Sequence, residues 1–151
     1  MRRKKNEKHL ASTISGSTDV MSPEQRSKCM SRIRSKNTTP EMIVRRIAHK
    51  LGYRFLLHKR DLPGTPDMVF PRHKKIIFVH GCFWHRHSCK FGRPSPKQNA
   101  AFWEKKLMGN VERDRISLRE LKKLGWKVLN VWECQTEKPV KLSLELKTFL
   151  S

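Results

Sequence analysis

The sequence predicts a mixed α/β fold, in which a sheet is flanked by helices, and three observations support this class. The expected elements occur in the order helix, three strands, helix, strand and helix. A long helical stretch precedes the last strand, and a crossover of that length can return its strand parallel to a partner. The length of 151 residues fits one domain with a core of its own.

The first part of the chain differs from the rest. Residues 1–20 have a basic start and a Ser/Thr/Gly stretch without periodicity, which predicts a disordered basic tail before a folded domain at 21–151. A capping-box pattern that starts at Ser22 predicts a helix over residues 22–35. Arg and Lys dominate this helix, so we expect it to lie against a phosphate backbone or to fray without a partner.

A second helix is expected to be buried. Thr39, placed before Pro40, predicts its N-cap, and Gly52 predicts its end. Its apolar residues recur at helical spacing and are Ile43, Val44, Ile47, Ala48 and Leu51. We therefore expect this face to be covered in the folded domain.

Strands and helices alternate in the remainder. Three short β-rich runs, separated by Pro, Gly and charged residues, predict a meander. They lie at 53–57, 67–70 and 75–80. Residues 97–124 look helical, with a break or bend near Gly109 and an end at Gly125. Residues 126–132 are expected to form a buried strand, and residues 140–150 a last helix.

The charge of the chain points to a polyanionic partner. With 34 Lys and Arg against 13 Asp and Glu, the net charge is +21, which would repel itself in a compact fold unless a polyanion screened it. Composition alone leaves open whether the protein is a nucleic-acid enzyme or a basic structural protein. No apolar run approaches the roughly 18 residues of a membrane span, and no signal-peptide core follows the basic start, so we expect a cytoplasmic protein.

The stretch at residues 80–89 concentrates thiols and imidazoles. In a chain without an export signal, cysteines are expected to be thiolates or metal ligands and not disulfides. Three ligands follow the pattern C-x4-H-x-C, and a fourth comes at the end of the later strand: Cys82, His87, Cys89 and Cys134. This set suits a closed, structural Zn2+ site, whereas the alternative is that the cysteines are small buried hydrophobes. Cys29 is left as a free thiol.

Aromatic side chains accompany the proposed zinc ligands. Phe83 and Trp84 lie between two of the ligands, and Trp103 has polar neighbours. Exposed aromatics among cations can stack on bases or wedge between base steps. Core packing is the better expectation for a single Trp. For Phe83 and Trp84, however, the position beside a metal favours contact with nucleic acid.

A carboxylate and two imidazoles are expected at one end of the sheet. Asp67 follows Pro66 and begins an apolar strand, so it could hold a hard cation there. An Asp after a turn is also ordinary turn chemistry. The next strand delivers His80 and His85 to the same end, which favours the functional interpretation.

Four segments together resemble a known family. PGTPD, HGCFWHRHSC, FWEKKLMGNVERD and GWKVLNVWEC occur in the order found in the very short patch repair DNA mismatch endonucleases, a branch of the PD-(D/E)XK nuclease superfamily. The resemblance covers about residues 22–134. It implies a restriction-endonuclease-like fold and a bacterial, nucleoid-associated monomer. Such an enzyme nicks one strand of duplex DNA beside the T of a T:G mismatch, which arises when 5-methylcytosine deaminates.

The resemblance also implies roles for individual residues. Asp67 would bind the catalytic Mg2+, and His85 would be the catalytic histidine. Glu41 would order the water around the ion, and His80 would be a further active-site histidine. The E-x-K of the superfamily is missing from the strand after Asp67, and the backbone carbonyl of Val79 would serve as a metal ligand in its place.

Other residues match the zinc and DNA contacts of this family. Cys82, His87, Cys89 and Cys134 match its structural zinc ligands. The aromatics that intercalate beside the mismatch are matched by Phe83, Trp84 and Trp103. The basic first helix, with Arg26, Met30 and Arg32, matches the segment that reaches the opposite groove.

Two other functions remain open from the sequence. A non-catalytic, zinc-stapled nucleic-acid-binding module would explain the charge and the aromatics, but not the acids and histidines together. A restriction-type nuclease that acts on matched duplex would contain the same residues. The bases around the site, an associated methyltransferase and downstream partner proteins are not encoded in any pattern that we can interpret.

Overall fold

The computed structural model describes residues 22, 24 and 36–151. The expected tail at 1–20 and nearly all of the expected basic helix at 22–35 lie outside the described residues. So do the expected DNA contacts Arg26, Met30 and Arg32 and the free thiol Cys29.

A mixed sheet forms the centre of the described domain. Its strands are β1 (Leu56–Leu57), β2 (Met68–Phe70), β3 (Lys75–His80) and β4 (Lys127–Trp132), in this spatial order. The first three strands are antiparallel neighbours, and β4 pairs parallel to β3, with Val79 opposite Val131. The predicted meander and the predicted parallel return of the last strand are both confirmed.

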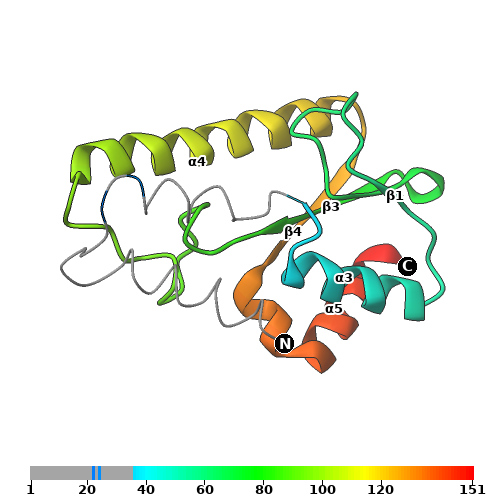
Figure 1. Ribbon diagram of the computed structural model, residues 1–151. Helices are drawn as coiled ribbons and strands as arrows, with labels where there is room; N and C mark the ends of the chain where they lie inside the picture. Colours follow the sequence, from blue (N-terminus) through cyan, green and yellow to red (C-terminus); the bar gives the residue numbers. More distant parts are fainter. Residues whose placement is uncertain (1–21, 23, 25–35) are drawn as a thin grey trace.

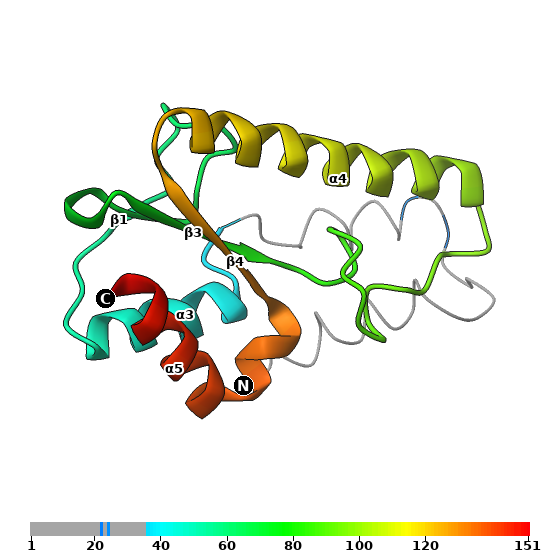
Figure 2. The same ribbon diagram turned by 180° about the vertical axis from the view of Figure 1, so that it is seen from behind.

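Helices cover both faces of the sheet. One face carries α4 (Ala100–Lys123), and the other carries α3 (Thr39–Lys50) and α5 (Pro139–Leu150). Figures 1 and 2 show this arrangement from opposite sides, with α4 alone on one side of the strands. The fold is therefore the predicted sheet flanked by helices. Among the described residues, no helix is both long and apolar enough to span a bilayer.

Two hydrophobic cores result from the alternation of side chains along the strands. On the side of α3 and α5, the core contains Val44, Ala48, Met68, Phe70, Ile77, Val131, Leu142, Leu146 and Leu150. On the side of α4, the core contains Val69, Ile76, Phe78 and Leu121. Because β2 and β3 are covered on both faces, their sequences are almost continuously apolar.

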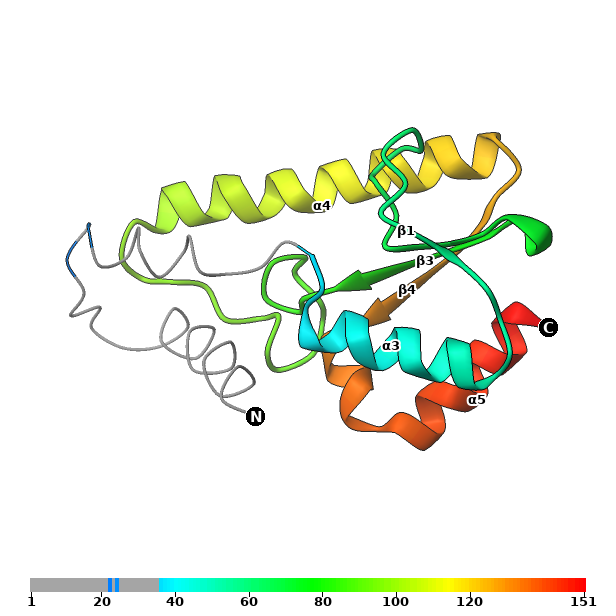
Figure 3. The same cartoon turned by 45° about the vertical axis from the view of Figure 1, so that its right-hand side comes forward.

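The ends of two parallel strands face the start of a helix. Figure 3 shows that β3 and β4 both point toward the side on which α3 begins. The loop that leaves β3 and the 3-10 turn that leaves β4 (Glu133–Glu137) start at this end. Polar side chains from all three segments can meet there, and the candidate site occupies this position.

The cap of α3 lies one residue before the predicted one. The side-chain oxygen of Thr38 accepts a hydrogen bond from the Glu41 amide (3.3 Å), so Thr38 and not Thr39 is the N-cap. The expectation was wrong because a proline is tolerated throughout the first helical turn and does not specify the residue before it as the cap. At the other end, Gly52 has a φ of +90°, as expected after a helix.

Two further expectations about elements were wrong. α4 runs through Gly109 without a break, and a side chain there would meet no atom within 4 Å. A single glycine costs helix stability, but the twenty-four-residue helix keeps its other contacts. β4 is not a fully buried strand: only Val131 is buried, because β4 has a single strand neighbour, β3, in the described sheet.

The cap position leads to a stability prediction. We expect Thr38→Ala to lower the free energy of unfolding by about 1 kcal/mol, because the Glu41 amide loses its acceptor. Thr39→Ala is the matched control, and its effect should be clearly smaller. Chemical denaturation of both variants would measure the difference. Equal losses, or a larger loss for Thr39→Ala, would contradict the assignment.

Candidate active site

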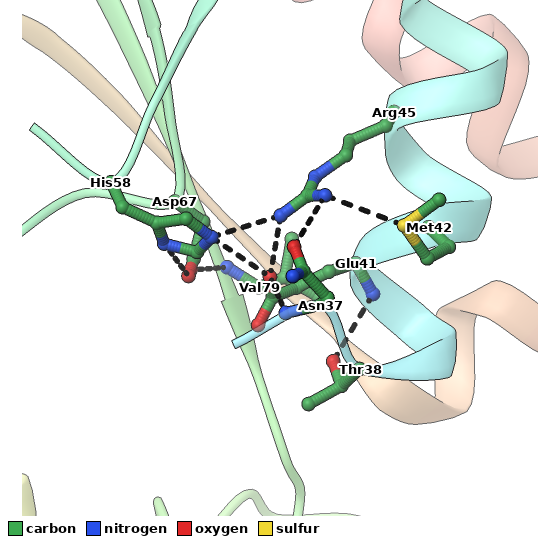
Figure 4. A network of polar contacts seen from close by, with 8 residues as sticks. All are labelled: Asn37, Thr38, Glu41, Met42, Arg45, His58, Asp67 and Val79. Carbon is green, nitrogen blue, oxygen red and sulfur yellow. Dashed lines mark hydrogen bonds and ion pairs between the residues drawn. The ribbon is translucent and has the colours of Figure 1, made fainter. Parts of the chain in front are cut away.

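Three separate segments bring acidic and imidazole groups to the end of the sheet. Asp67 precedes β2, Glu41 lies in the first turn of α3, and His58 follows β1. A ligand atom from each of the three lies within 4.8 Å of the others. Figure 4 shows their side chains converging beside Val79 of β3. We call these three residues the carboxylate site.

Asp67 is held by the sheet and is largely buried. Its Oδ2 accepts a hydrogen bond from the Val79 amide (2.7 Å), and its Oδ1 lies 3.8 Å from Nδ1 of His58. Burial raises the pKa of Asp67 to about 7, the hydrogen bond from Val79 opposes this rise, and the nearby Glu41 adds to it. A buried carboxylate with a raised pKa gains most from a cation placed beside it.

Glu41 is buried although it belongs to the first turn of a helix. Only 3% of it is exposed. Its Oε2 accepts hydrogen bonds from the Asn37 amide and from the Arg45 guanidinium, each 3.0 Å long, and the same oxygen lies 3.6 Å from Nε2 of His58. The two hydrogen bonds, from Asn37 and Arg45, offset the cost of burying a charged group.

The carboxylate site fits a hard divalent cation. Two carboxylates provide oxygen donors, which Mg2+ prefers. Glu41 raises the pKa of Asp67 through charge repulsion, and Arg45 compensates only in part, so an added cation would relieve the repulsion. Val79 borders this site through its amide. The site therefore has oxygen donors and an excess of negative charge that a divalent cation could neutralise.

Two histidines and an aspartate form a second group next to the first. His85, in the loop after β3, has its Nδ1 2.5 Å from Oδ2 of Asp114 on α4. The rings of His80 and His85 lie 4.0 Å apart between centroids. Burial lowers the pKa of His80 to about 4, and the neighbouring His85 contributes to the lowering. His80 is therefore neutral at physiological pH. We call His80, His85 and Asp114 the histidine site.

The two groups belong to one site. Val79, which holds Asp67, directly precedes His80 on β3. The charge of His85 also lowers the pKa of Asp67, which requires the two side chains to lie within electrostatic range of each other. The structure thus brings Asp67, Glu41, His80 and His85 together at one end of the sheet, as expected.

Several residues of the site were not recognised in the sequence. His58 and Arg45 contact the carboxylates, and Asp114 contacts His85 across 29 positions of the chain. Asp114 ends the FWEKKLMGNVERD segment, which is the one signal that could have indicated it. His58 and Arg45 lie outside all four motif segments, and no sequence spacing relates them to Asp67.

A third group could hold a soft metal ion. Ligand atoms of Cys82, His87, Cys89 and Cys134 all lie within 4.8 Å of one another. In a tetrahedral zinc site, each sulfur lies about 2.3 Å from the ion, so the ligand atoms also lie within this limit of one another. The three cysteines carry free thiols, and the His87 ring stacks on Trp132 with centroids 4.2 Å apart. The predicted cysteine cluster is confirmed as a group that could bind a metal.

A glycine determines the shape of the loop around this cluster. A Cβ atom at Gly92 would overlap the carbonyl oxygen of His87 and lie 2.6 Å from its amide nitrogen. The chain can pass the ligand His87 at this distance only without a side chain. Gly92 therefore keeps the loop closed around the cysteine cluster.

The aromatic residues pack more deeply than expected. Phe83 and Trp103 are 3% and 6% exposed and form a small core with Leu107 of α4, against which the partly buried Trp84 packs. Phe83 was expected to be exposed, and this was wrong, because the loop after β3 folds back onto α4. Trp103 follows the expectation for a single Trp. Its neighbour Phe102 is exposed, at 60%.

Comparison with known proteins is consistent with this geometry. The family model described as DNA mismatch endonuclease Vsr matches residues 18–91. The chain is 46% identical over 133 residues to the type II nicking enzyme V.XorIIP of Xanthomonas oryzae, covering 88% of this chain and 97% of that protein. It is 39% identical over 130 residues to the DNA mismatch endonuclease Vsr of Escherichia coli, covering 86% and 83%. For the type II nicking enzyme V.NmeAIP of Neisseria meningitidis the identity is 42% over 118 residues, covering 78% and 84%.

The close approach at Gly92 predicts a specific loss of metal. We expect Gly92→Ala to open the loop at His87, so that the purified protein contains less metal and melts at a lower temperature. Gly109→Ala is the matched control, since nothing lies within 4 Å of its added carbon, and it should gain about 0.5–1 kcal/mol of stability. Elemental mass spectrometry and calorimetry would measure both. An unchanged metal content in Gly92→Ala would be inconsistent with this role.

The raised pKa of Asp67 predicts a pH-dependent effect on stability. The folded-state pKa of Asp67, about 7, lies above its ordinary value of 3.8. The free energy of unfolding therefore has its full contribution from protonated Asp67 below pH 3.8, and this contribution is lost as the pH rises through 7. Asn cannot ionise, so Asp67→Asn should raise the melting temperature more at pH 8 than at pH 5, in buffer without added Mg2+. Asp61→Asn, at an exposed acid of the same loop, should show no such dependence. A gain of equal size at the two pH values would rule out this explanation.

Proposed function

Because this chain belongs to the Vsr family of DNA mismatch endonucleases, we propose that it cuts one strand of duplex DNA beside the mispaired T of a T:G mismatch left by deamination of 5-methylcytosine. Family membership makes the chain a DNA endonuclease with the restriction-endonuclease-like fold. Two of its relatives are named nicking enzymes, which supports cleavage of a single strand. The observation that carries the proposal is that the carboxylate site and the histidine site both lie at the end of β3.

We propose that the carboxylate site binds Mg2+. Asp67 and the backbone carbonyl of Val79 would be the protein ligands, and Glu41 would hold the surrounding water. The ion would stabilise the charge that develops on the phosphate during hydrolysis. The buried Asp67, whose pKa is raised in the absence of a cation, supports this assignment.

His85 would act as the general base. An ionised Asp114 can only accept, so the 2.5 Å contact requires the proton of His85 to be on Nδ1. Its Nε2 then has a free lone pair with which to take a proton from the attacking water. His80 packs on the same ring and would support its position beside the phosphate. Proton transfer and charge stabilisation would thus come from adjacent groups.

The aromatic cluster would select the mismatch by deforming the duplex. Trp84 is its partly exposed member, so we propose that Trp84 enters the base stack while Phe83 and Trp103 support it from behind. Opening a stack costs a few kcal/mol and costs least at a mispaired step. Lys106, 5.6 Å above the Trp84 ring, supplies positive charge beside this edge. Arg26, Met30 and Arg32 remain proposed contacts to the opposite groove.

A structural zinc ion is proposed for the cysteine cluster. Three thiols and one imidazole select Zn2+ over hard cations. Bound zinc would tie the loop after β3, which carries His85 and Trp84, to Cys134 beyond β4. We further propose that the protein acts as a monomer on chromosomal DNA in the bacterial cytoplasm, with a folded domain at 21–151 preceded by a basic tail.

A nicking assay tests the function directly. One labelled duplex would carry T:G, matched T:A or 5-methylcytosine:G at the same position, with and without Mg2+. We expect a nick in one strand of the T:G duplex alone, and only with the ion present. Equal cleavage of the matched duplex would identify a restriction-type nuclease, and no cleavage of any duplex would favour a binding module.

Asp67→Ala tests the metal assignment in the same assay. Loss of a ligand that contributes several kcal/mol should reduce the nicking rate by about 1,000-fold or more, while affinity for the T:G duplex stays near that of the unaltered protein. Asp61→Ala, which removes an exposed acid nearby, is the control and should cleave normally. Substantial cleavage by Asp67→Ala would refute the assignment.

A further inference from the structure

We propose that His58 is a positioning residue, which orients the Asp67 carboxylate for its divalent ion through an Nδ1–H that Arg45 keeps protonated. The inference depends on the proposed Mg2+ at Asp67 and extends it to a residue that no motif of the sequence indicates. Three observations support it: the backbone conformation of His58, the contacts of its two ring nitrogens, and the contacts of the two carboxylate oxygens of Asp67.

The backbone of His58 adopts an unusual conformation. Its φ of 45° lies in the left-handed region, which residues other than glycine adopt only occasionally and which His adopts more readily than most. The amide of His58 donates to the carbonyl of Asp67 (3.3 Å), directly after β1. This conformation directs the ring toward the carboxylate site, where it is 15% exposed. Strained residues of this kind concentrate at functional sites.

The partners of the ring determine which nitrogen carries the proton. The Arg45 guanidinium lies 2.9 Å from Nε2 of His58, and a guanidinium has donors only. Nε2 must therefore accept, and in the neutral ring the proton is on Nδ1. Arg45 is itself held by Glu41 (3.0 Å) and by the side-chain oxygen of Asn37 (2.8 Å), so its position is well defined. The Nδ1–H of His58 thus faces Oδ1 of Asp67.

A donor group then faces each of the two oxygens of Asp67, one of them already at hydrogen-bond distance. The Val79 amide holds Oδ2 at 2.7 Å, while Nδ1 of His58 lies 3.8 Å from Oδ1. A movement of about 1 Å would bring that pair to hydrogen-bond distance. Each carboxylate oxygen keeps a lone pair for an ion. Hydrogen bonds to a ligand from its surroundings typically contribute about 10- to 100-fold in metal affinity or activity.

The same geometry excludes His58 as a ligand. Its Nε2 lone pair is used by Arg45, and its Nδ1 carries a proton, so neither nitrogen can coordinate an ion. The three-residue group at the carboxylate site is therefore two carboxylates and an orienting imidazole. This arrangement retains an oxygen donor set, which suits Mg2+ better than a softer metal.

Variants of His58 separate orientation from packing. His58→Phe keeps the ring and the backbone strain but removes both nitrogens, whereas His58→Gln keeps a donor and an acceptor. Mn2+, used as the probe, would be titrated into each protein and the free ion measured by electron paramagnetic resonance. We expect affinity to fall about 10-fold in His58→Phe and to be largely restored in His58→Gln. His49→Phe, on the exposed face of α3, is the control and should bind normally.

The outcomes distinguish this inference from the proposed function. If Asp67→Asn binds Mn2+ as tightly as the unaltered protein, the proposed metal site itself is disproved. Asp67-dependent binding that His58→Phe leaves unchanged would overturn the role of His58 alone. Equal weakening in His58→Phe and His58→Gln, with a matching fall in melting temperature, would indicate packing instead and would also overturn it.

A spectroscopic measurement tests the proton position without any metal. Nitrogen-15 chemical shifts of His58 at pH 8 should show a protonated Nδ1 and an unprotonated Nε2. In Arg45→Met the Nδ1-protonated and Nε2-protonated tautomers should both be present, because the guanidinium no longer donates to Nε2. A protonated Nε2 in the unaltered protein would overturn the inference, whatever the metal titration showed.

Discussion

The hydrogen bond from the Val79 amide to the Asp67 carboxylate is the contact on which the rest of the site depends. It joins the strand that pairs with both β2 and β4 to the acid that precedes β2. The residue after Val79 is His80, and the loop that follows carries His85 and two residues of the cysteine cluster, Cys82 and Cys89. A shift of β3 by one residue would therefore displace the carboxylate, the histidines and the cysteine cluster together.

Burial of charge shifts the pKa values of this site and costs the folded chain stability. Glu41 and Asp67 lie close to each other in a poorly solvated place, which raises the pKa of Asp67 and leaves a deficit of positive charge that Arg45 only partly fills. His80 is driven to its neutral form by the same burial. Such groups destabilise the folded chain until a cation or a phosphate binds, and this is the usual relation between an active site and the stability of its scaffold.

The sequence predicted the elements better than the details of their ends and surfaces. Short β-rich, mostly apolar runs identified β2, β3 and β4, and the length of residues 97–124 identified the crossover. The cap at Thr38, the unbroken helix at Gly109 and the burial of Phe83 were not predicted correctly. In each case the local rule was incomplete: a proline is tolerated at several positions of the first helical turn, a long helix has many other contacts, and α4 lies over the loop.

The order of residues along the chain was sufficient to determine the fold class, the cysteine cluster and the presence of Asp67, His80 and His85 at one end of the sheet. These follow from periodicity, from ligand spacing and from the alternation of strands, which are all local properties. Only the tertiary structure could identify His58 and Arg45, whose segments carry no signal of their own, and only it pairs Asp114, the last residue of a motif segment, with His85. These residues matter because of the atoms that they contact, and those contacts depend on how separate segments of the chain pack together.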